Sequence, residues 1–381
     1  MNILIIALDF KPSYGGIAED THSIAKFLHS RGDKVIVLSQ IMKKSESFDK
    51  NNSYDIIRLD SSIYYKSKSI NKYKIYKKIK EIVKKESIDI IILNALGKSC
   101  FTFWFCSKLI DLPFCVFTHG KEVNLKFRDI EKFKKGFILR HSNLIVCHSN
   151  FTKNLVKNLG VKSKKIFISF PAIDASKNKK TDKTPSKFNK EILSNKKVIL
   201  TIGRLIERKG IDNTIKALKN VINFFPNIIY LVVGDGPHKA KLEELTNNLE
   251  LNEYVKFVGF IPEEEKESYY SITDIFIMPA RELENGDAEG FGIVFLEANY
   301  YEVPVIGGKS GGMPDAIEDG ASGFLVDPLD ITDISSAIIK LLKDEGLIKI
   351  MGKLGKIRVE KNFNEKNLDK LREKLLTYVE E

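Results

Sequence analysis

Short runs of consecutive β-branched and apolar residues alternate with stretches of helical periodicity along nearly the whole chain. In the first half these runs lie at 3–7, 35–38, 56–59, 88–93, 114–117 and 144–147, and in the second at 198–202, 228–233, 255–258, 275–278, 303–306 and 324–326. Strands that are apolar on both faces and separated by helices are typical of parallel sheets covered by helices on both sides. The sequence therefore predicts an α/β fold with two doubly wound sheets.

The amino-acid composition of the chain changes between the two series of expected strands. Residues 174–195 are rich in Lys, Ser and Thr and lose all periodicity, which is typical of a linker. A chain of 381 residues is also long for a single hydrophobic core. We expect an N-terminal domain at 1–173 and a C-terminal domain at 196–363 that face each other across a cleft, with ligands at the carboxyl ends of the strands.

Composition excludes several other classes of protein. Hydrophobic residues make up 43% of the chain, which favours a globular protein. No run of about 18 apolar residues is present, so we expect no membrane span. The apolar N-terminus lacks the basic region and cleavage site of a signal peptide and is interpreted as a buried strand. The four cysteines show neither a CxxC pair nor metal-ligand spacing, which predicts reduced thiols in a cytoplasmic protein.

Much of the positive charge gathers in two segments. The net charge is +11; residues 64–85 interleave lysines with tyrosines, and residues 126–140 interleave lysines and arginines with phenylalanines. Basic and aromatic residues on one helix suit an anionic membrane surface and also nucleic acid. A helix face that is merely well solvated is the alternative interpretation.

Two carboxylates bracket an unusual helix start in the segment from Glu289 to Glu297. Gly290 and Gly292 stand at the helix entry, although glycine disfavours helix formation, and Glu297 follows four apolar residues. Glycine lets a ligand approach the backbone, and a helix N-terminus attracts anions. This pattern indicates a ligand that carries both phosphate and hydroxyl groups.

Three further turns of the second half follow expected strands. Arg204 and Lys209 lie five residues apart in the first turn, where a guanidinium and an ammonium can converge on a diphosphate. The turn at 234–237 reads Gly-Asp-Gly-Pro, and the turn at 307–314 reads Gly-Gly-Lys-Ser-Gly-Gly-Met-Pro. Backbone N–H groups of such glycine-dense loops can surround a phosphate. An exposed basic loop is the alternative for the first turn.

Two turns of the first half also suggest a site. Gly15 and Gly16 follow the first strand and open a helix, a place where the backbone can meet an anion, although an ordinary turn would have the same sequence. His119 and Glu122 follow the fifth strand. A histidine at the carboxyl end of a buried strand can donate a hydrogen bond or titrate near neutral pH.

Taken in order, these motifs resemble those of the nucleotide-sugar-dependent glycosyltransferases of family 4, which have the GT-B fold of two Rossmann-like domains. The resemblance covers essentially the whole chain and is strongest to the bacterial branch that contains phosphatidylinositol mannosyltransferases and exopolysaccharide glycosyltransferases. It implies a retaining transfer of a hexose that requires no metal. It also implies that the stretch 364–381 is a helix that packs back on the N-terminal domain. Asp315 departs from the family, which often has Glu at that position.

The resemblance assigns roles to individual residues. Arg204 and Lys209 would bind the donor diphosphate, Glu289 the transferred sugar, and Glu297 the ribose. The diphosphate would lie over the helix start at Gly292 and Ile293. His119 would stand beside the reacting carbon. The remaining assignments are Val258 and Gly16 to the donor, Gly15, Gly16 and Glu122 to the acceptor, and Asp287 to sugar hydroxyls.

Donor and acceptor remain open at this stage. The branch resemblance favours GDP-mannose, while UDP-glucose, UDP-galactose and UDP-N-acetylglucosamine are alternatives. The acceptor would be lipid-linked or a saccharide, at the inner face of the cell membrane. A nucleic-acid-binding protein is supported by charge alone, so we expect no nucleic-acid partner. A dinucleotide-dependent oxidoreductase would need a GxGxxG motif that the sequence lacks.

Overall fold

The computed structural model of the protein describes residues 1–13, 15–60, 69–97, 99–126, 129–173, 185, 193 and 195–380. Nearly all of the expected linker at 174–195 lies outside these residues, as do positions 64–68 and 127–128 of the two basic segments. The chain divides into two compact units. The first comprises Met1–Ala172 together with Glu365–Glu381, and the second comprises Ile173–Asn364.

The first unit contains a seven-stranded sheet with strand order β3-β2-β1-β4-β5-β6-β7. All neighbouring strands pair in parallel. The strands are β1 (Asn2–Ile6), β2 (Lys34–Gln40), β3 (Asp55–Leu59), β4 (Ile90–Leu93), β5 (Phe114–Thr118), β6 (Leu144–Cys147) and β7 (Ile166–Ile168). The helices are α1 (Gly16–Ser30), α2 (Ser45–Lys50), α4 (Ser69–Glu86), α5 (Cys100–Ile110), α6 (Asp129–His141), α7 (Asn150–Asn158) and α16 (Lys366–Leu376).

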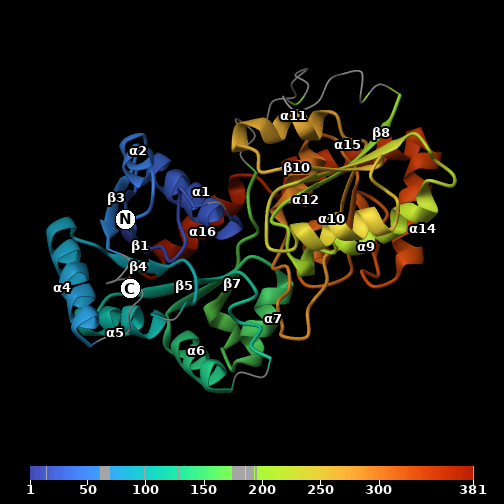
Figure 1. The fold of residues 1–381 in the computed structure, drawn as a ribbon. Coiled ribbons are helices and arrows are strands. Elements are labelled where there is room, and N and C mark those ends of the chain that lie inside the picture. Colours follow the sequence, from blue (N-terminus) through green and yellow to red (C-terminus); the bar gives the residue numbers. More distant parts are fainter. Residues whose placement is uncertain are drawn as a thin grey trace. The chain divides into compact units, whose positions relative to one another are not determined.

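Successive residues of each buried strand enter opposite layers of the core. In β1, Leu4 and Ile6 pack in the layer that α4, α5 and α6 cover, while Ile3 and Ile5 pack in the layer that α1 and α16 cover. Figure 1 shows these two groups of helices on opposite sides of the sheet. The continuous apolar runs of the sequence are therefore explained by a sheet that is buried on both faces.

The second unit repeats this architecture with six parallel strands in the order β10-β9-β8-β11-β12-β13. The strands are β8 (Lys197–Ile202), β9 (Ile228–Val233), β10 (Val255–Gly259), β11 (Ile275–Met278), β12 (Val305–Gly308) and β13 (Gly323–Val326). The helices are α9 (Ile211–Val221), α10 (Lys239–Asn248), α11 (Lys266–Ser271), α12 (Ile293–Tyr300), α13 (Met313–Ala316), α14 (Ile331–Lys343) and α15 (Glu345–Asn362). Ile275 and Ile277 of β11 face the layer of α9 and α14, whereas Phe276 meets Phe295 of α12 edge to face at 5.5 Å.

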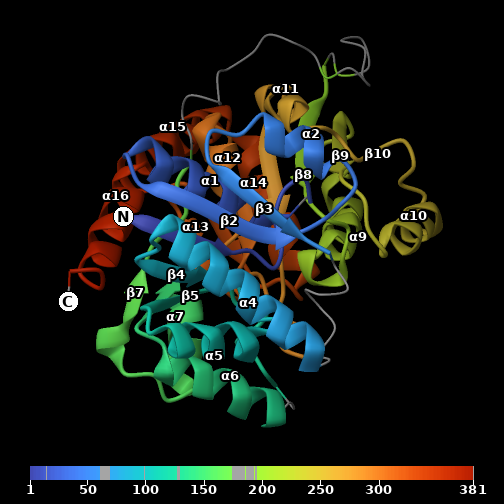
Figure 2. The ribbon, with the colours of Figure 1, turned by 90° about the vertical axis from the view of Figure 1, so that its left-hand side faces the viewer.

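The last helix joins the first unit. Leu371 and Leu375 of α16 are buried in the layer that α1 covers, and Figure 2 shows α16 beside α1. Ion pairs add to this contact: the guanidinium of Arg372 lies 2.6 Å from the carboxylate of Asp33, which is 1% exposed. The first unit is therefore built from two pieces of chain that are separated by the whole second unit. Among the described helices, none is long and apolar enough to cross a bilayer.

Candidate active site

The switch in strand order of the second unit lies between β8 and β11. In doubly wound sheets, ligands bind at the carboxyl ends of the strands near this switch. The loops that follow β8 and β11 carry the candidate residues at 204–209 and 281–292, and the second loop leads into α12. The sheet therefore places residues from two distant segments at one edge.

Glu289 forms the centre of this edge. Its Oε2 atom lies 2.8 Å from the Nζ atom of Lys209 and 3.3 Å from the guanidinium of Arg208. Burial acts to raise the pKa of Glu289, but the charges of Lys209 and then Arg208 outweigh it and hold the pKa below its usual value. The carboxylate is therefore ionised at neutral pH and available to accept hydrogen bonds.

Asp287 and Arg204 complete the charges of this edge. The side chain of Asp287 is only 13% exposed, and its Oδ1 atom lies 3.6 Å from the Nε atom of Arg208. Arg204 is exposed, and it forms no ion pair with any other residue that the structure describes. Two cations thus face two buried carboxylates, and Arg204 remains as the surplus positive charge for an incoming anion.

The entry of α12 is built on a glycine in the left-handed region. Gly292 is the N-cap residue with φ 90°, and Ile293 is the first residue of the helix. A side chain at Gly292 would meet the ring of Phe295 at 2.7 Å, so the turn requires glycine. The first N–H groups of a helix have no acceptor within it and favour a negative charge at this point.

Glu297 lies on the second turn of α12. It accepts a 2.6 Å hydrogen bond from the hydroxyl of Tyr270, and its other oxygen lies 3.5 Å from the Nζ atom of Lys266. Burial and then the charge of Glu297 raise the pKa of Tyr270 well above its ordinary value, so the phenol keeps its proton and remains a donor. Tyr270 and Lys266 therefore fix one orientation of this carboxylate.

The glycine-dense loop at 307–314 lies against the backbone of Glu289 and Gly290. Its N–H group at Gly312 donates a 2.9 Å hydrogen bond to the carbonyl oxygen of Glu289. A side chain at Gly312 would collide with the carbonyl of Gly290. The loop supports the backbone beneath Glu289, and that donor is not available to a phosphate. Val258 stands near the carboxyl end of β10, at the same edge of the sheet.

In the first unit, His119 lies at the carboxyl end of β5 with three polar neighbours. Its Nε2 atom is 2.7 Å from the carbonyl oxygen of Asn94, which follows β4. Its own backbone N–H donates to the carboxylate of Glu122. Its ring lies against that of His148, which follows β6, with 4.9 Å between the ring centroids. His148 in turn lies 3.2 Å from Asp20 of α1.

Asp20, His119 and His148 form one titratable cluster. Each offers one possible metal-ligand atom, and these atoms lie within 4.8 Å of one another. The Nε2 atom of His119 is already engaged with Asn94, and Asp20 is ion-paired with His148. The three groups are therefore coupled, because the charge of each one affects the pKa of the others.

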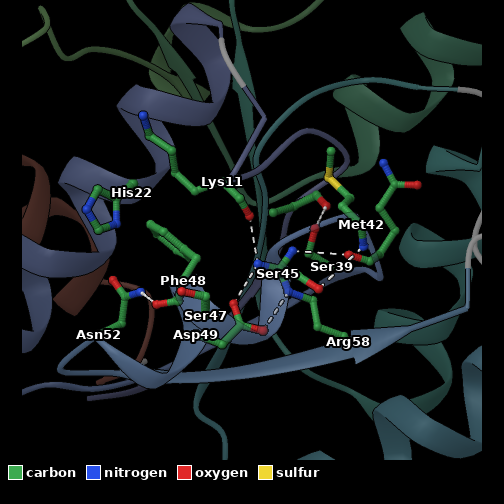
Figure 3. A network of polar contacts seen from close by, with 12 residues as sticks. Lys11, His22, Ser39, Met42, Ser45, Ser47, Phe48, Asp49, Asn52 and Arg58 are labelled. Carbon is green, nitrogen blue, oxygen red and sulfur yellow. Dashed lines mark hydrogen bonds and ion pairs between the residues drawn. The ribbon is translucent and has the colours of Figure 1, made fainter. Parts of the chain in front are cut away.

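The loop after β1 is held by Arg58 of β3. Figure 3 shows the Arg58 guanidinium between Asp49 and the backbone of Lys11. It donates to both carboxylate oxygens of Asp49 at 2.7 and 3.0 Å, and to the carbonyls of Lys11 at 2.7 Å and Gln40 at 3.1 Å. The start of the loop that leads to Gly15 and Gly16 is therefore anchored, and Gly16 opens α1 at the carboxyl end of β1.

The structure thus groups the sequence-predicted residues into two sets. Lys209, Glu289, Gly292, Ile293 and Glu297 belong to the second unit, and Gly15, Gly16, His119 and Glu122 belong to the first. Sequence reasoning missed Arg208, Lys266, Tyr270, Asp20 and His148. Arg208 adjoins Lys209 in the same basic turn and was recognisable there. The others belong to no motif and are brought in by the fold alone.

Similarity to known proteins indicates the family to which the chain belongs. Residues 14–177 match the family described as Glycosyltransferase Family 4, and residues 182–358 match the family described as Glycosyl transferases group 1. A GDP-mannose-dependent alpha-(1-6)-phosphatidylinositol monomannoside mannosyltransferase of Mycolicibacterium smegmatis is 25% identical over 359 residues, covering 93% of this chain and 92% of the relative. A GDP-mannose-dependent monoacylated alpha-(1-6)-phosphatidylinositol monomannoside mannosyltransferase of Corynebacterium glutamicum is 28% identical over 377 residues, covering 95% and 94%.

A solved structure supports the same conclusion about the fold. The crystal structure of Anabaena Alr3699/HepE in complex with UDP and glucose superposes with a TM-score of 0.83, at 18% identity, over 98% of this chain and 99% of that one. The expected architecture of two Rossmann-like domains is confirmed. The chain is a glycosyltransferase of family 4, a hexosyltransferase with the GT-B fold that takes its sugar from a nucleotide-sugar donor.

Proposed function

We propose that the protein is a retaining mannosyltransferase that uses GDP-mannose and a lipid-linked or saccharide acceptor in the synthesis of a cell-envelope glycan or glycolipid. The observation that carries the proposal is the Lys209–Glu289 ion pair of 2.8 Å at the start of α12. It joins a cation for a diphosphate to a carboxylate for sugar hydroxyls, at the end of a helix that favours an anion.

Each half of the donor has a place along this edge. The diphosphate lies at the N–H groups of Gly292 and Ile293, where it draws Arg204 and Lys209 toward it. Glu289, released from part of its ion pair, accepts hydrogen bonds from hydroxyls of the sugar. Glu297, already oriented by Tyr270, accepts hydrogen bonds from the ribose.

The reaction replaces one bond to the anomeric carbon by another. The bond from that carbon to the diphosphate oxygen breaks, the acceptor hydroxyl oxygen bonds to the carbon, and the hydroxyl proton passes to the leaving diphosphate. Arg204 and Lys209 stabilise the negative charge that develops on the diphosphate. His119 lies beside the reacting carbon, and no metal ion takes part.

The proposal also specifies the nucleotide base of the donor. The names of the mannosyltransferase relatives favour GDP-mannose, and the UDP-bound relative of the same fold keeps UDP-sugars as the second candidate. Thermal unfolding with GDP, UDP, GDP-mannose and UDP-glucose separates the two. A ligand at about 100 times its dissociation constant stabilises by about 2.7 kcal/mol, so GDP should raise the melting temperature while UDP at the same concentration does not. A response to neither nucleotide would refute the donor site.

We also propose that the enzyme is cytoplasmic and binds the inner face of the cell membrane through α4 and α5. The lysines of α4 that face solvent are Lys72, Lys74, Lys77, Lys80, Lys84 and Lys85. Beside them, Tyr73 is 65% exposed, Phe101 48%, Phe105 49% and Leu109 55%. A cavity of about 350 Å³ lies between the two helices, and these four side chains line it together with Lys72, Tyr76, Thr102 and Cys106. Cations around an exposed apolar patch suit anionic headgroups above acyl chains.

Vesicle co-sedimentation tests the membrane surface. The wild type should bind vesicles with anionic lipid more tightly than neutral vesicles, and increasing salt should weaken this binding. Lys72→Ser with Lys77→Ser should lose about thirtyfold in affinity, at about 1 kcal/mol for each lysine near the surface. The matched control replaces two exposed lysines of the second unit, Lys241 and Lys353, and should bind like the wild type. Equal binding to both kinds of vesicle would exclude this surface.

A further inference from the structure

The strongest unexplained feature of the first unit is a buried carboxylate beside a buried imidazole. The Oδ2 atom of Asp20 and the Nε2 atom of His148 are 3.2 Å apart. Neither atom has a hydrogen-bond partner among the described residues. The other nitrogen of His148, Nδ1, lies 2.7 Å from the carbonyl oxygen of Ser169. The pair lies next to His119, because the ring of His119 contacts that of His148.

The geometry fixes the protons of His148. The carbonyl oxygen of Ser169 only accepts, so Nδ1 carries a proton. If Nε2 carried only a lone pair, it would face the carboxylate oxygen of Asp20 across 3.2 Å of buried space, and both atoms would be left unsatisfied. A proton on Nε2 makes the ring an imidazolium, whose positive charge lies 3.2 Å from the carboxylate oxygen and compensates its negative charge.

The same reasoning fixes His119. Its Nε2 atom meets the carbonyl oxygen of Asn94 at 2.7 Å and must donate. A second proton, on Nδ1, would place two imidazolium rings 4.9 Å apart at their centroids, where like charges repel. His119 is therefore neutral, and its Nδ1 atom is a hydrogen-bond acceptor.

We propose that the Asp20–His148 ion pair is a positioning device that holds His119 neutral, so that Nδ1 of His119 accepts a hydrogen bond from a hydroxyl of the reacting sugars. The inference rests on the proposed function of His119 and adds two residues that do not touch the substrate. Asp20 supplies the counter-charge, His148 supplies the fixed positive charge, and Asn94 fixes the tautomer.

The pKa directions agree with this geometry. Burial acts to lower the pKa of His148, but Asp20 outweighs it and the pKa is raised. Burial and then the charge of His148 lower the pKa of His119, against the opposing effects of Glu122 and Asp20. The charged and titratable groups that face His119 are thus His148 after β6, Asp20 on α1 and Glu122 in its own loop.

The first experiment needs no variant. The chain has six histidines, so the ring signals of protein labelled with ¹³C and ¹⁵N in histidine can be resolved and followed from pH 5.5 to 9. At pH 7.0, His148 should be doubly protonated, and His119 should be neutral with its proton on Nε2. Two neutral rings would overturn the proposal. So would a protein that carries one equivalent of metal at these residues, measured by elemental analysis.

The second experiment is His148→Gln, which removes the charge and leaves Asp20 facing His119. The apparent pKa of His119 should rise by about one unit or more. The acidic limb of the pH profile of kcat/KM should move up by the same amount, so that activity falls at pH 6 and recovers toward pH 8.5. The Kd for the nucleotide, which the second unit binds, should not change. An unchanged titration of His119 in a folded variant would refute the proposal.

Two control variants distinguish a failure of the proposed ion-pair role from misfolding of the variant. His141→Gln makes the same substitution at an exposed histidine of α6 and should leave the titration and the pH profile unchanged. Asp20→Asn combined with His148→Gln removes both charges at once, and this double variant replaces the single variant if His148→Gln does not fold. In the double variant the pKa of His119 should also rise. If no nucleotide sugar is turned over, the proposed function fails, but the titration of His119 still decides the role of the ion pair.

Discussion

Replacing Lys209 by methionine removes one charge from the donor edge and keeps a side chain of similar length. Lys209 is 8% exposed, and its Nζ atom lies 2.8 Å from the buried Oε2 atom of Glu289. The substitution leaves Arg208, at 3.3 Å, as the remaining cation beside this carboxylate oxygen. We expect a loss of stability in the second unit in addition to weaker binding of the donor diphosphate.

The size of the loss follows from the two distances. With an effective dielectric constant of about 20, unit charges at 2.8 Å attract by about 6 kcal/mol and those at 3.3 Å by about 5 kcal/mol. Breaking a buried pair that has no other partner costs about 3–5 kcal/mol after desolvation. Because Arg208 retains nearly half of the attraction, Lys209→Met should reduce the free energy of unfolding by about 2 kcal/mol.

The loss should depend on pH with a definite sign. The pKa of Glu289 in the folded state lies below its usual value. The ion pair therefore contributes fully above the unfolded-state pKa of about 4.3 and is lost as pH falls through the folded-state pKa. The difference in stability between wild type and Lys209→Met should be largest at pH 7 and should shrink below about pH 4.3, as Glu289 takes up a proton.

Urea unfolding with two probes measures the effect. The single tryptophan, Trp104, lies on α5 and reports the first unit, whereas far-ultraviolet circular dichroism reports both units. The dichroism transition of the second unit should move while the fluorescence transition stays. Lys309→Met replaces an exposed lysine of the same unit and should change neither. A loss below about 0.5 kcal/mol, or a loss that is the same at pH 7 and at about pH 3.5, would refute the reasoning from the buried pair.

Three further variants test other contacts. Tyr270→Phe removes the 2.6 Å hydrogen bond to Glu297 and should weaken nucleotide binding about tenfold by calorimetry; unchanged affinity would mean that Glu297 is oriented by other groups. Arg58→Met removes the pair with Asp49 and two bonds to the carbonyls of Lys11 and Gln40, and should lower the stability of the first unit by about 3 kcal/mol in the tryptophan transition. Leu371→Ala empties a site that is 1% exposed and should cost about 2–5 kcal/mol in the same transition, where no shift would contradict the packing of α16.

Most strands could be predicted because their apolar runs are uninterrupted. The runs at Leu144–Cys147, Ile228–Val233 and Ile275–Met278 coincide with the observed strands, and every residue in them is buried. The edge strand Ile166–Ile168 was missed because it has three residues that are only partly buried. A short edge strand has too few buried apolar residues to stand out from the neighbouring loops in the sequence.

The site was predictable only where its residues are near in sequence. Glu289 and Glu297 stand on either side of one helix entry, so their spacing alone indicates a common ligand. Asp20 and His148 meet because the carboxyl ends of several parallel strands share one edge. No local pattern records that meeting, so only the fold could reveal it.

The return of α16 to the first unit has a consequence for the order in which the protein is made. During synthesis, the apolar face of α1 that α16 covers stays uncovered until the ribosome has added the roughly 200 residues of the second unit, which takes about 10–40 s at 5–20 residues per second. The second unit, a continuous stretch of chain, can complete its fold earlier. The nascent first unit must therefore wait with an exposed apolar face, and this interval is when chaperones or premature association would act on the chain.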